Sequence, residues 1–279
     1  MTFKDLAELH CLSQPYLGAP NGRPYILDMD GVRSLHFEAT TIQSQMKLDD
    51  PDVLELDYTQ AMMGFLLFAE TPRTIEMIGL GGGSLAKYCF RRLPQAKITV
   101  VEISEDVIGL RETFDVPPDD FRFSVVHADG AEYVRDHRRS TDVLLVDGFD
   151  LGGQPPQLCS PGFYDHCHAR LNDGGMMVIN LCTSDPRYGV YARRIRESFD
   201  DRVVFVPAED GCNQIAFASK AACFPPSRAT LFERASALTR QFDFAPRRIA
   251  QRILHRLERR GKHFDARDNR PARRAWCQG

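Results

Sequence analysis

A glycine-rich stretch between Thr74 and Glu102 constrains this chain more than any other feature. An apolar run of strand length meets four glycines in five positions, and a helix-like segment then leads to a second apolar strand. Glycines allow a tight turn and a close approach of ligand to backbone, and the helix that follows offers unpaired N–H groups at its start. Glu102 closes the second strand nineteen residues after Gly83, where a carboxylate can accept hydrogen bonds from ribose hydroxyls. The stretch therefore predicts a nucleoside-binding site.

The spacing of the glycines indicates which kind of nucleoside is bound. A dinucleotide fingerprint G-x-G-x-x-G would need glycine at position 84, where Ser84 stands. Gly79, Gly81 and Gly83, with Gly82 between them, instead follow G-x-G-x-G, which is typical of S-adenosylmethionine-type loops. A tight turn without a ligand is the alternative, and the acid at the end of the second strand argues against it.

The rest of the apolar pattern alternates between strands and helices. It predicts an α/β fold of the Rossmann-like S-adenosylmethionine-dependent transferase type, with a mostly parallel seven-stranded sheet and an antiparallel end strand. The last two strands are too close for a helical crossover, so one of them must be antiparallel. The predicted strands are 75–78, 98–101, 121–126, 143–146, 176–180, 203–206 and 214–218, and the main predicted helices are 54–68, 105–114, 131–137, 162–171 and 188–199.

Three regions are expected along the chain. Residues 1–53 form a small N-terminal β region with a hairpin, and residues 54–223 form the Rossmann-like catalytic domain. Residues 224–279, after Pro225-Pro226, form a basic helical tail with helices at 231–238 and 246–260 and a disordered end from Gly261. We expect this tail to be dispensable for chemistry.

Composition excludes several classes of protein. The eight cysteines include no C-x-x-C pair, and the neighbours His166, Cys167 and His168 point in different directions on a helix, so no metal site is predicted. No window approaches 18 uninterrupted apolar residues, and the first twelve residues lack the apolar run of a signal peptide. The sequence predicts a cytoplasmic protein without a membrane segment.

Charge is unevenly distributed. Residues 224–279 hold 14 Lys+Arg and 5 Asp+Glu, a net charge of +9, which leaves −12 for residues 1–223 of a chain whose total is −3. A nucleic-acid contact by the basic tail is one hypothesis, but the tail lacks interleaved aromatics and a recognised motif, so a solvated helix face is favoured. The acidic body favours cationic ligands, with solubility as the alternative role of an acidic surface.

Acids follow three successive predicted strands. Glu102, Asp129 and Asp147 stand at strand ends, and Asp150 lies one turn further on. Ligands of open α/β sheets bind outside the carboxyl ends of the strands, so these side chains are expected in one cleft. Helix capping is the alternative role of each loop acid, and Asp150 fits that alternative best.

At this point the sequence resembles the spermidine synthase (polyamine aminopropyltransferase) family. The pattern of that family is GGGDGG, then E-I-D, then D-G, then D-[ST]-[ST]-D-P with a downstream F-Y pair and an upstream Y-Q-E-M. This chain has Gly81-Gly82-Gly83, Glu102-Ile103, Asp129-Gly130, Asp147-Gly-Phe-Asp150, Phe163-Tyr164 and Thr59-Gln60-Ala61-Met62. The resemblance covers roughly residues 24–220.

The resemblance implies a role for each of these positions. Glu102 would hold the ribose, Asp129 and Gly130 the adenine, and Gln43 and Gln60 the tail of the cofactor, with Ile103 and the glycine loop beside it. Asp147 would act as base on the attacking amine, and Asp150 would bind the amine, with Tyr58 and Thr59 near it. The co-substrate would be decarboxylated S-adenosylmethionine or S-adenosylmethionine, the partner a small amine, and the assembly a homodimer.

Departures from the family pattern leave rivals open. Ser84 replaces the aspartate that would pair with the amino end of decarboxylated S-adenosylmethionine, Thr59 replaces the motif tyrosine, and Val206 to Asp210 replace the late P-x-Y-P-S-G stretch. Without that aspartate the site would more easily admit intact S-adenosylmethionine. An S-adenosylmethionine-dependent methyltransferase is therefore the first rival, and a nucleoside-binding protein without catalysis is the second.

Overall fold

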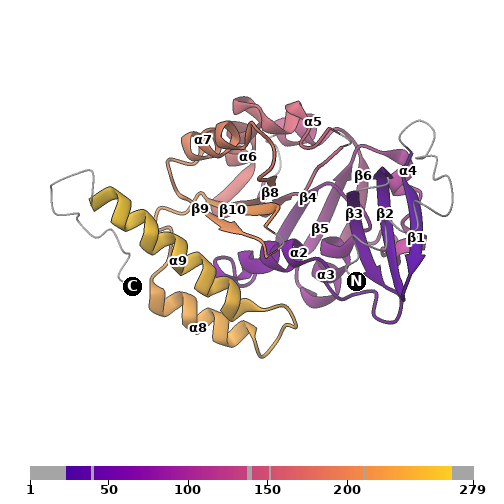
Figure 1. The fold of residues 1–279 in the computed structure, drawn as a ribbon, viewed down its shortest axis with the longest axis horizontal. Coiled ribbons are helices and arrows are strands. Elements are labelled where there is room, and N and C mark those ends of the chain that lie inside the picture. The colour runs from indigo at the N-terminus through magenta and orange to yellow at the C-terminus, as the bar shows by residue number, and fades with distance from the viewer. Residues whose placement is uncertain (1–22, 39–40, 137–139, 151, 210, 266–279) are drawn as a thin grey trace.

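A seven-stranded sheet forms the centre of the computed structural model, which describes residues 23–38, 41–136, 140–150, 152–209 and 211–265 (Figure 1). The strand order is β6-β5-β4-β7-β8-β10-β9. The strands from β6 to β8 are parallel, whereas β10 is antiparallel to both β8 and β9. The strands are β4 (Thr74–Ile78), β5 (Lys97–Glu102), β6 (Phe123–His127), β7 (Thr141–Val146), β8 (Leu171–Cys182), β9 (Val203–Pro207) and β10 (Asn213–Ser219).

This topology confirms the predicted Rossmann-like fold and its seven strands. The antiparallel strand is indeed the last in the chain, but it does not close the sheet. A short connection joins β9 to β10 as a hairpin, and β10 uses its other edge to pair with β8. The edge strand at this end of the sheet is therefore β9, and β6 is the edge strand at the other end.

Helices cover both faces of the sheet (Figure 1). Alternate residues of β4 enter two separate apolar clusters, Ile75 and Met77 in one and Ile78 in the other, as expected for a strand buried on both sides. The first cluster is covered by α2 (Asp57–Met62), α3 (Ser84–Arg92), α4 (Glu105–Ile108), α8 (Arg228–Leu238) and α9 (Pro246–Asp265). The second is covered by α5 (Gly130–Arg135), the 3-10 helix η3 (Pro156–Cys159), α6 (Pro161–Arg170) and α7 (Tyr188–Ser198).

The N-terminal region is a separate antiparallel sheet of three strands, β1 (Tyr25–Met29), β2 (Val32–Glu38) and β3 (Thr41–Lys47). Asp30 and Gly31 turn with positive φ between β1 and β2, which confirms the predicted hairpin. The third strand was not predicted, because its sequence TIQSQMK carries only two apolar residues. Leu35 and Met46 join the core cluster that contains α3, which attaches this sheet to the main domain.

Two predicted helices are interrupted. The segment 54–68 forms α2 and then the 3-10 helix η1 (Met63–Leu67), and the segment 105–114 forms α4 and the 3-10 helix η2 (Glu112–Phe114). Gly64 lies so close to Ile249 and Phe217 that an added Cβ would press on both side chains. Gly109 directly follows α4, at the point where the predicted helix is interrupted, and glycine is a weak helix former.

The two C-terminal helices pack on the sheet domain. Leu231 and Ile253 are fully buried in the same cluster as β4 and η1. Helix α9 extends five residues beyond Arg260, into the stretch that was expected to be disordered, and residues 266–279 lie outside the described part. Within the described residues no helix has both the length and the hydropathy of a membrane span. The division into three regions stays a prediction.

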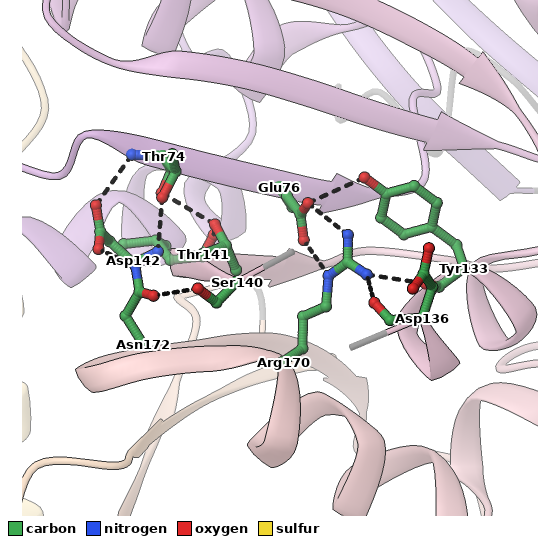
Figure 2. Close-up of polar contacts among 10 residues, drawn as sticks. Thr74, Glu76, Tyr133, Asp136, Ser140, Thr141, Asp142, Arg170 and Asn172 are labelled. Atoms are coloured by element: carbon green, nitrogen blue, oxygen red, sulfur yellow. Dashed lines mark hydrogen bonds and ion pairs between the residues drawn. The ribbon is translucent and has the colours of Figure 1, made fainter. Parts of the chain in front are cut away.

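A buried ion pair lies beneath β4 (Figure 2). Glu76 accepts two hydrogen bonds from the guanidinium of Arg170 on α6, at 2.7 and 2.8 Å, and a third from the hydroxyl of Tyr133 on α5, at 2.9 Å. The Arg170 side chain is 1% exposed, and its guanidinium lies over the Tyr133 ring. These contacts tie the central strand to two helices.

A second acid in Figure 2, Asp142 at the start of β7, is also satisfied by the protein. It accepts the backbone N–H groups of Arg73 and Thr74 at 2.8 and 3.0 Å, and the side-chain amide of Asn172 at 2.6 Å. The carboxylate thus joins the beginnings of β4, β7 and β8.

Candidate active site

A cavity of about 680 Å³ opens at the carboxyl ends of β4 to β7. Strands β2 and β3 close one side, and the ends of β8 and β10 close another. The described lining contains five carboxylates and no lysine, arginine or histidine; the acids are Glu38, Glu102, Asp129, Asp147 and Asp150. Low-dielectric walls of one charge sign concentrate ligands of the opposite sign. The cavity therefore favours a cation.

Two of the four glycines in the loop line the cavity, and the other two pack against neighbouring residues. Gly79 and Gly81 line the cavity, together with the start of α3. A Cβ at Gly79 would collide with the backbone carbonyl of Asp147, so glycine permits β4 and β7 to approach closely. Gly82 and Gly83 are not among the lining residues: Gly82 packs against Ser44, and Gly83 is the left-handed N-cap of α3. A direct ligand contact of these two glycines is not supported by their placement.

Glu102 ends β5 and lines the cavity beside the glycine loop. One carboxylate oxygen accepts the N–H of Leu80 in the glycine loop at 2.8 Å, and the other accepts the N–H of Ser104 at 2.9 Å. Each oxygen can accept a further hydrogen bond, because a carboxylate has about four acceptor sites. The adjacent Ile103 lines the cavity and is 58% exposed, which leaves an apolar surface beside the acid.

Asp129 combines two roles. Its Oδ1 caps α5 by accepting the N–H groups of Ala131 and Glu132 at 2.7 and 3.2 Å. It also lines the cavity with Gly130. The alternatives of capping and ligand binding are therefore compatible at this position.

Asp147 lies deep in the cavity, just after β7. It accepts hydrogen bonds from the Asn180 amide, at 3.0 Å, and from the Tyr58 hydroxyl. Burial raises the pKa of Asp147, and the two hydrogen bonds oppose that rise. A carboxylate with a raised pKa and two orienting donors is suited to accept a proton.

The upstream motif is arranged differently from the expectation. Thr59 lines the cavity, but its hydroxyl donates to the Leu56 carbonyl at 2.6 Å. Gln60 is not among the lining residues, and its amide donates to the Leu54 carbonyl at 2.9 Å. Tyr58, one position before the expected motif tyrosine, supplies the hydroxyl that reaches Asp147. The structure therefore brings Tyr58 to Asp147 and leaves Gln60 outside the cavity lining.

The remaining expected residues lie around the rim. Asp150 is exposed, and its carboxylate accepts the N–H of Gly152 at 2.7 Å in a turn, so it does not cap a helix. Gln43 lines the cavity from β3. Ser84 begins α3, and its hydroxyl donates to the Gln45 carbonyl at 3.3 Å.

Asn180 is a site residue that the sequence argument missed. It ends the apolar run of β8, is 3% exposed, lines the cavity, and donates to Asp147. Its backbone carbonyl accepts the amide of Gln154 at 3.0 Å, and its Oδ1 has no hydrogen-bond partner within the described residues. A polar residue that closes an otherwise apolar strand was the available signal. In the part of the chain that is described, no group of His, Cys, Asp or Glu side chains could hold a metal ion.

Comparison with known proteins agrees with this geometry. A model of the spermine/spermidine synthase domain matches residues 55–185. A polyamine aminopropyltransferase of Neisseria meningitidis serogroup B is 36% identical over 241 residues, which cover 86% of this chain and 92% of the relative. A polyamine aminopropyltransferase of Chromobacterium violaceum is 42% identical over 184 residues, 66% of this chain and 70% of the relative.

A solved structure supports the fold. The crystal structure of a probable spermidine synthase from Corynebacterium glutamicum superposes with a TM-score of 0.66 at 24% identity, over 78% of this chain and 82% of that one. A structure of 24% identity supports the fold alone, whereas the relatives of 36% and 42% identity show the family. From the glycine loop, the acidic cavity and these matches together, the chain belongs to the spermine/spermidine synthase family of polyamine aminopropyltransferases.

Proposed function

We propose that this protein transfers an aminopropyl group from decarboxylated S-adenosylmethionine to a polyamine-type amine. The observation that carries the proposal is the cavity itself. It joins the nucleoside end, at the glycine loop and Glu102, to a partly buried base, Asp147, within a lining that holds five carboxylates and no described basic side chain. A sulfonium nucleoside and an ammonium substrate are both cations, so this lining suits the two reactants together.

The nucleoside end would hold the co-substrate by its ribose and base. The carboxylate of Glu102 would accept the ribose hydroxyls, and Ile103 would cover the adenine. Asp129 and Gly130 would contact the edge of the adenine, and Gln43 would face the tail of the co-substrate. These roles come from the placement of the side chains and from the family resemblance.

The chemical step needs a neutral amine. Asp147 would take a proton from the ammonium, and the nitrogen lone pair would then attack the aminopropyl carbon bonded to sulfur. A new C–N bond forms as the C–S bond breaks, and the electron pair returns to sulfur, which leaves as the neutral thioether methylthioadenosine. The sulfonium supplies its own leaving group, so positioning and the proton acceptor supply most of the acceleration.

Asp150 would hold the amine from the rim. Its exposed carboxylate lies three residues after Asp147, and it lines the same cavity. A second ammonium at the far end of a diamine would find an anion there without displacing the base.

Product analysis tests the proposal. The purified protein would be offered putrescine, cadaverine and spermidine, each with decarboxylated S-adenosylmethionine or with S-adenosylmethionine, and products would be identified by mass spectrometry. Transfer of an aminopropyl group supports the proposal. Methyl transfer would favour the rival suggested by Ser84, and methylthioadenosine binding without modification of any amine would favour a binding protein.

Three further expectations from the sequence are proposed with it. The protein acts in the cytoplasm, it needs no metal ion, and it forms a homodimer. Light scattering of the purified chain checks the dimer, and activity after chelation checks the independence from metal.

A further inference from the structure

One arginine of the C-terminal helix connects three elements behind the amine end of the cavity. Arg252 on α9 contacts Asp57 at 3.3 Å, donates to the carbonyl of Pro207 at 3.3 Å, and pairs with Glu209. Its side chain is 17% exposed, so much of the ion pair is shielded from solvent. We call Arg252, Asp57 and Glu209 the α9 clamp.

A backbone hydrogen bond also joins the two acids of the α9 clamp directly. The N–H of Glu209 donates to the carboxylate of Asp57 at 2.5 Å, so the first turn of α2 and the connection between β9 and β10 are joined directly. Arg248, one turn earlier on α9, contacts Glu209 at 2.5 Å. Two carboxylates thus share two guanidinium groups, and Arg252 is the group that reaches both of them.

Both elements joined by the clamp lead into the cavity. Asp57 precedes Tyr58, whose hydroxyl contacts the base Asp147. On the other side, the connection that carries Glu209 continues to Cys212 and Asn213, which line the cavity. This connection occupies the place of the family stretch P-x-Y-P-S-G that the chain lacks.

We propose that Arg252 is a positioning residue for the amine substrate: through Asp57 and Glu209 it fixes Tyr58 and the Cys212–Asn213 wall of the cavity. The inference rests on the proposed function. It also differs from the expectation that the whole tail is dispensable for chemistry, because α9 would then support the acceptor end of the site. Without the guanidinium of Arg252, Asp57 loses its arginine partner, and Arg248 offsets only the charge of Glu209. The two carboxylates would then repel each other, and the backbone hydrogen bond from Glu209 to Asp57 would hold the two elements less firmly.

The fold itself does not depend on this contact. Ile249, Ile253 and Leu254 bury α9 against the main core, and they would remain in place if the guanidinium were removed. An effect on the site can therefore be separated from an effect on folding. The nucleoside end is lined by other elements, so affinity for methylthioadenosine should not change.

The test compares Arg252→Met with Arg247→Met, a matched change at an exposed arginine of the same helix. We expect Arg252→Met to raise the apparent KM for the amine about ten-fold, with a smaller change in kcat, and the control to leave both unchanged. Affinity for methylthioadenosine should stay within about two-fold of that of the unaltered protein in calorimetry. Asp57→Asn, which removes one carboxylate charge, provides a second variant should Arg252→Met not fold.

Hydrogen exchange supplies a readout that does not need turnover. In Arg252→Met, exchange should rise at residues 207–213 and at the first turn of α2, and it should not change in β4. Faster exchange there with an unchanged KM for the amine would overturn the positioning role, as would equal effects of Arg252→Met and Arg247→Met. If the unaltered protein modifies no amine, the proposed function fails separately. The clamp is then tested by amine binding in calorimetry, and equal amine affinity of the two variants would overturn it.

Discussion

Two groups of acidic side chains in this molecule differ in what surrounds them. Away from the carboxyl edge of the sheet, Glu76 in β4 and Asp142 at the start of β7 are bonded to groups of the protein itself. These groups are a guanidinium, a phenol, an amide and backbone N–H groups. At the carboxyl edge, Glu102, Asp147 and Asp150 accept hydrogen bonds from neutral donors and face a cavity whose described lining carries no basic side chain. The residue types are the same, and the partners differ.

The comparison separates two roles of a carboxylate. A buried acid that is paired inside the protein strengthens the fold only while its partner remains, because an uncompensated buried charge is strongly unfavourable. An acid that faces a cavity without a cationic partner keeps its negative charge available for a cationic ligand. Asp142 also has neutral donors, but it lies outside the cavity lining. Exposure to the cavity without a cationic partner, more than burial, therefore indicates which acids of this chain are available to a ligand.

The largest difference should appear in turnover. Asp147→Asn removes the proton acceptor and preserves the shape of the side chain, so we expect turnover to fall by roughly 10²–10⁴-fold. Affinity for methylthioadenosine should be unchanged, since Glu102 and the glycine loop are intact. Single-turnover kinetics with a diamine and calorimetry measure the two quantities, and a variant of near-normal rate would assign the base elsewhere.

A change in the paired group should act on stability instead. Arg170→Met leaves Glu76 without its guanidinium in the interior, and the free energy of unfolding should fall by about 3–5 kcal/mol. Denaturant titration measures this loss. Methylthioadenosine affinity of the folded fraction should remain normal, and the double variant Glu76→Gln with Arg170→Met should recover part of the stability.

Nucleoside affinity should respond to Glu102. Glu102→Gln removes the charge that strengthens its hydrogen bonds to the ribose, and binding of methylthioadenosine should weaken by roughly 1.5–3 kcal/mol. Calorimetry gives the difference directly. An unchanged dissociation constant would remove Glu102 from ribose recognition.

The smallest expected effect is a gain in stability at Asp147, opposite in sign to the loss of stability expected for Arg170→Met. Burial raises the pKa of Asp147 above its unfolded value, so its ionised form opposes folding once the pH is above the folded pKa. As the pH falls through that pKa, the folded state takes up the proton and the penalty disappears. Asp147→Asn should therefore stabilise the protein by about 1 kcal/mol at neutral pH, with a smaller gain in acid. Thermal unfolding at several pH values checks the sign, and destabilisation at neutral pH would contradict it.

Local patterns in the sequence predicted much of the fold and the placement of Glu102 beside the glycine loop. The sheet strands follow from short apolar runs, and the glycine loop and Glu102 follow from spacing within one β-turn-α-β unit. What escaped prediction depends on contacts between distant segments. Asn180 reaches Asp147 from a neighbouring strand, and the amide of Gln60 is taken by the Leu54 carbonyl. Arg252 reaches Asp57 across 195 positions, a pairing that no local pattern encodes.

Gly79 has a consequence for how this protein can vary. The strand that ends in the glycine loop and the strand that ends in Asp147 approach so closely there that a single added methyl group would meet the carbonyl of Asp147. In a saturation library selected for function, position 79 should return glycine alone. Gly189, which has open space around its Cα and an ordinary φ, should accept alanine. Position 189 on α7 can therefore vary more freely than position 79, where the two central strands meet.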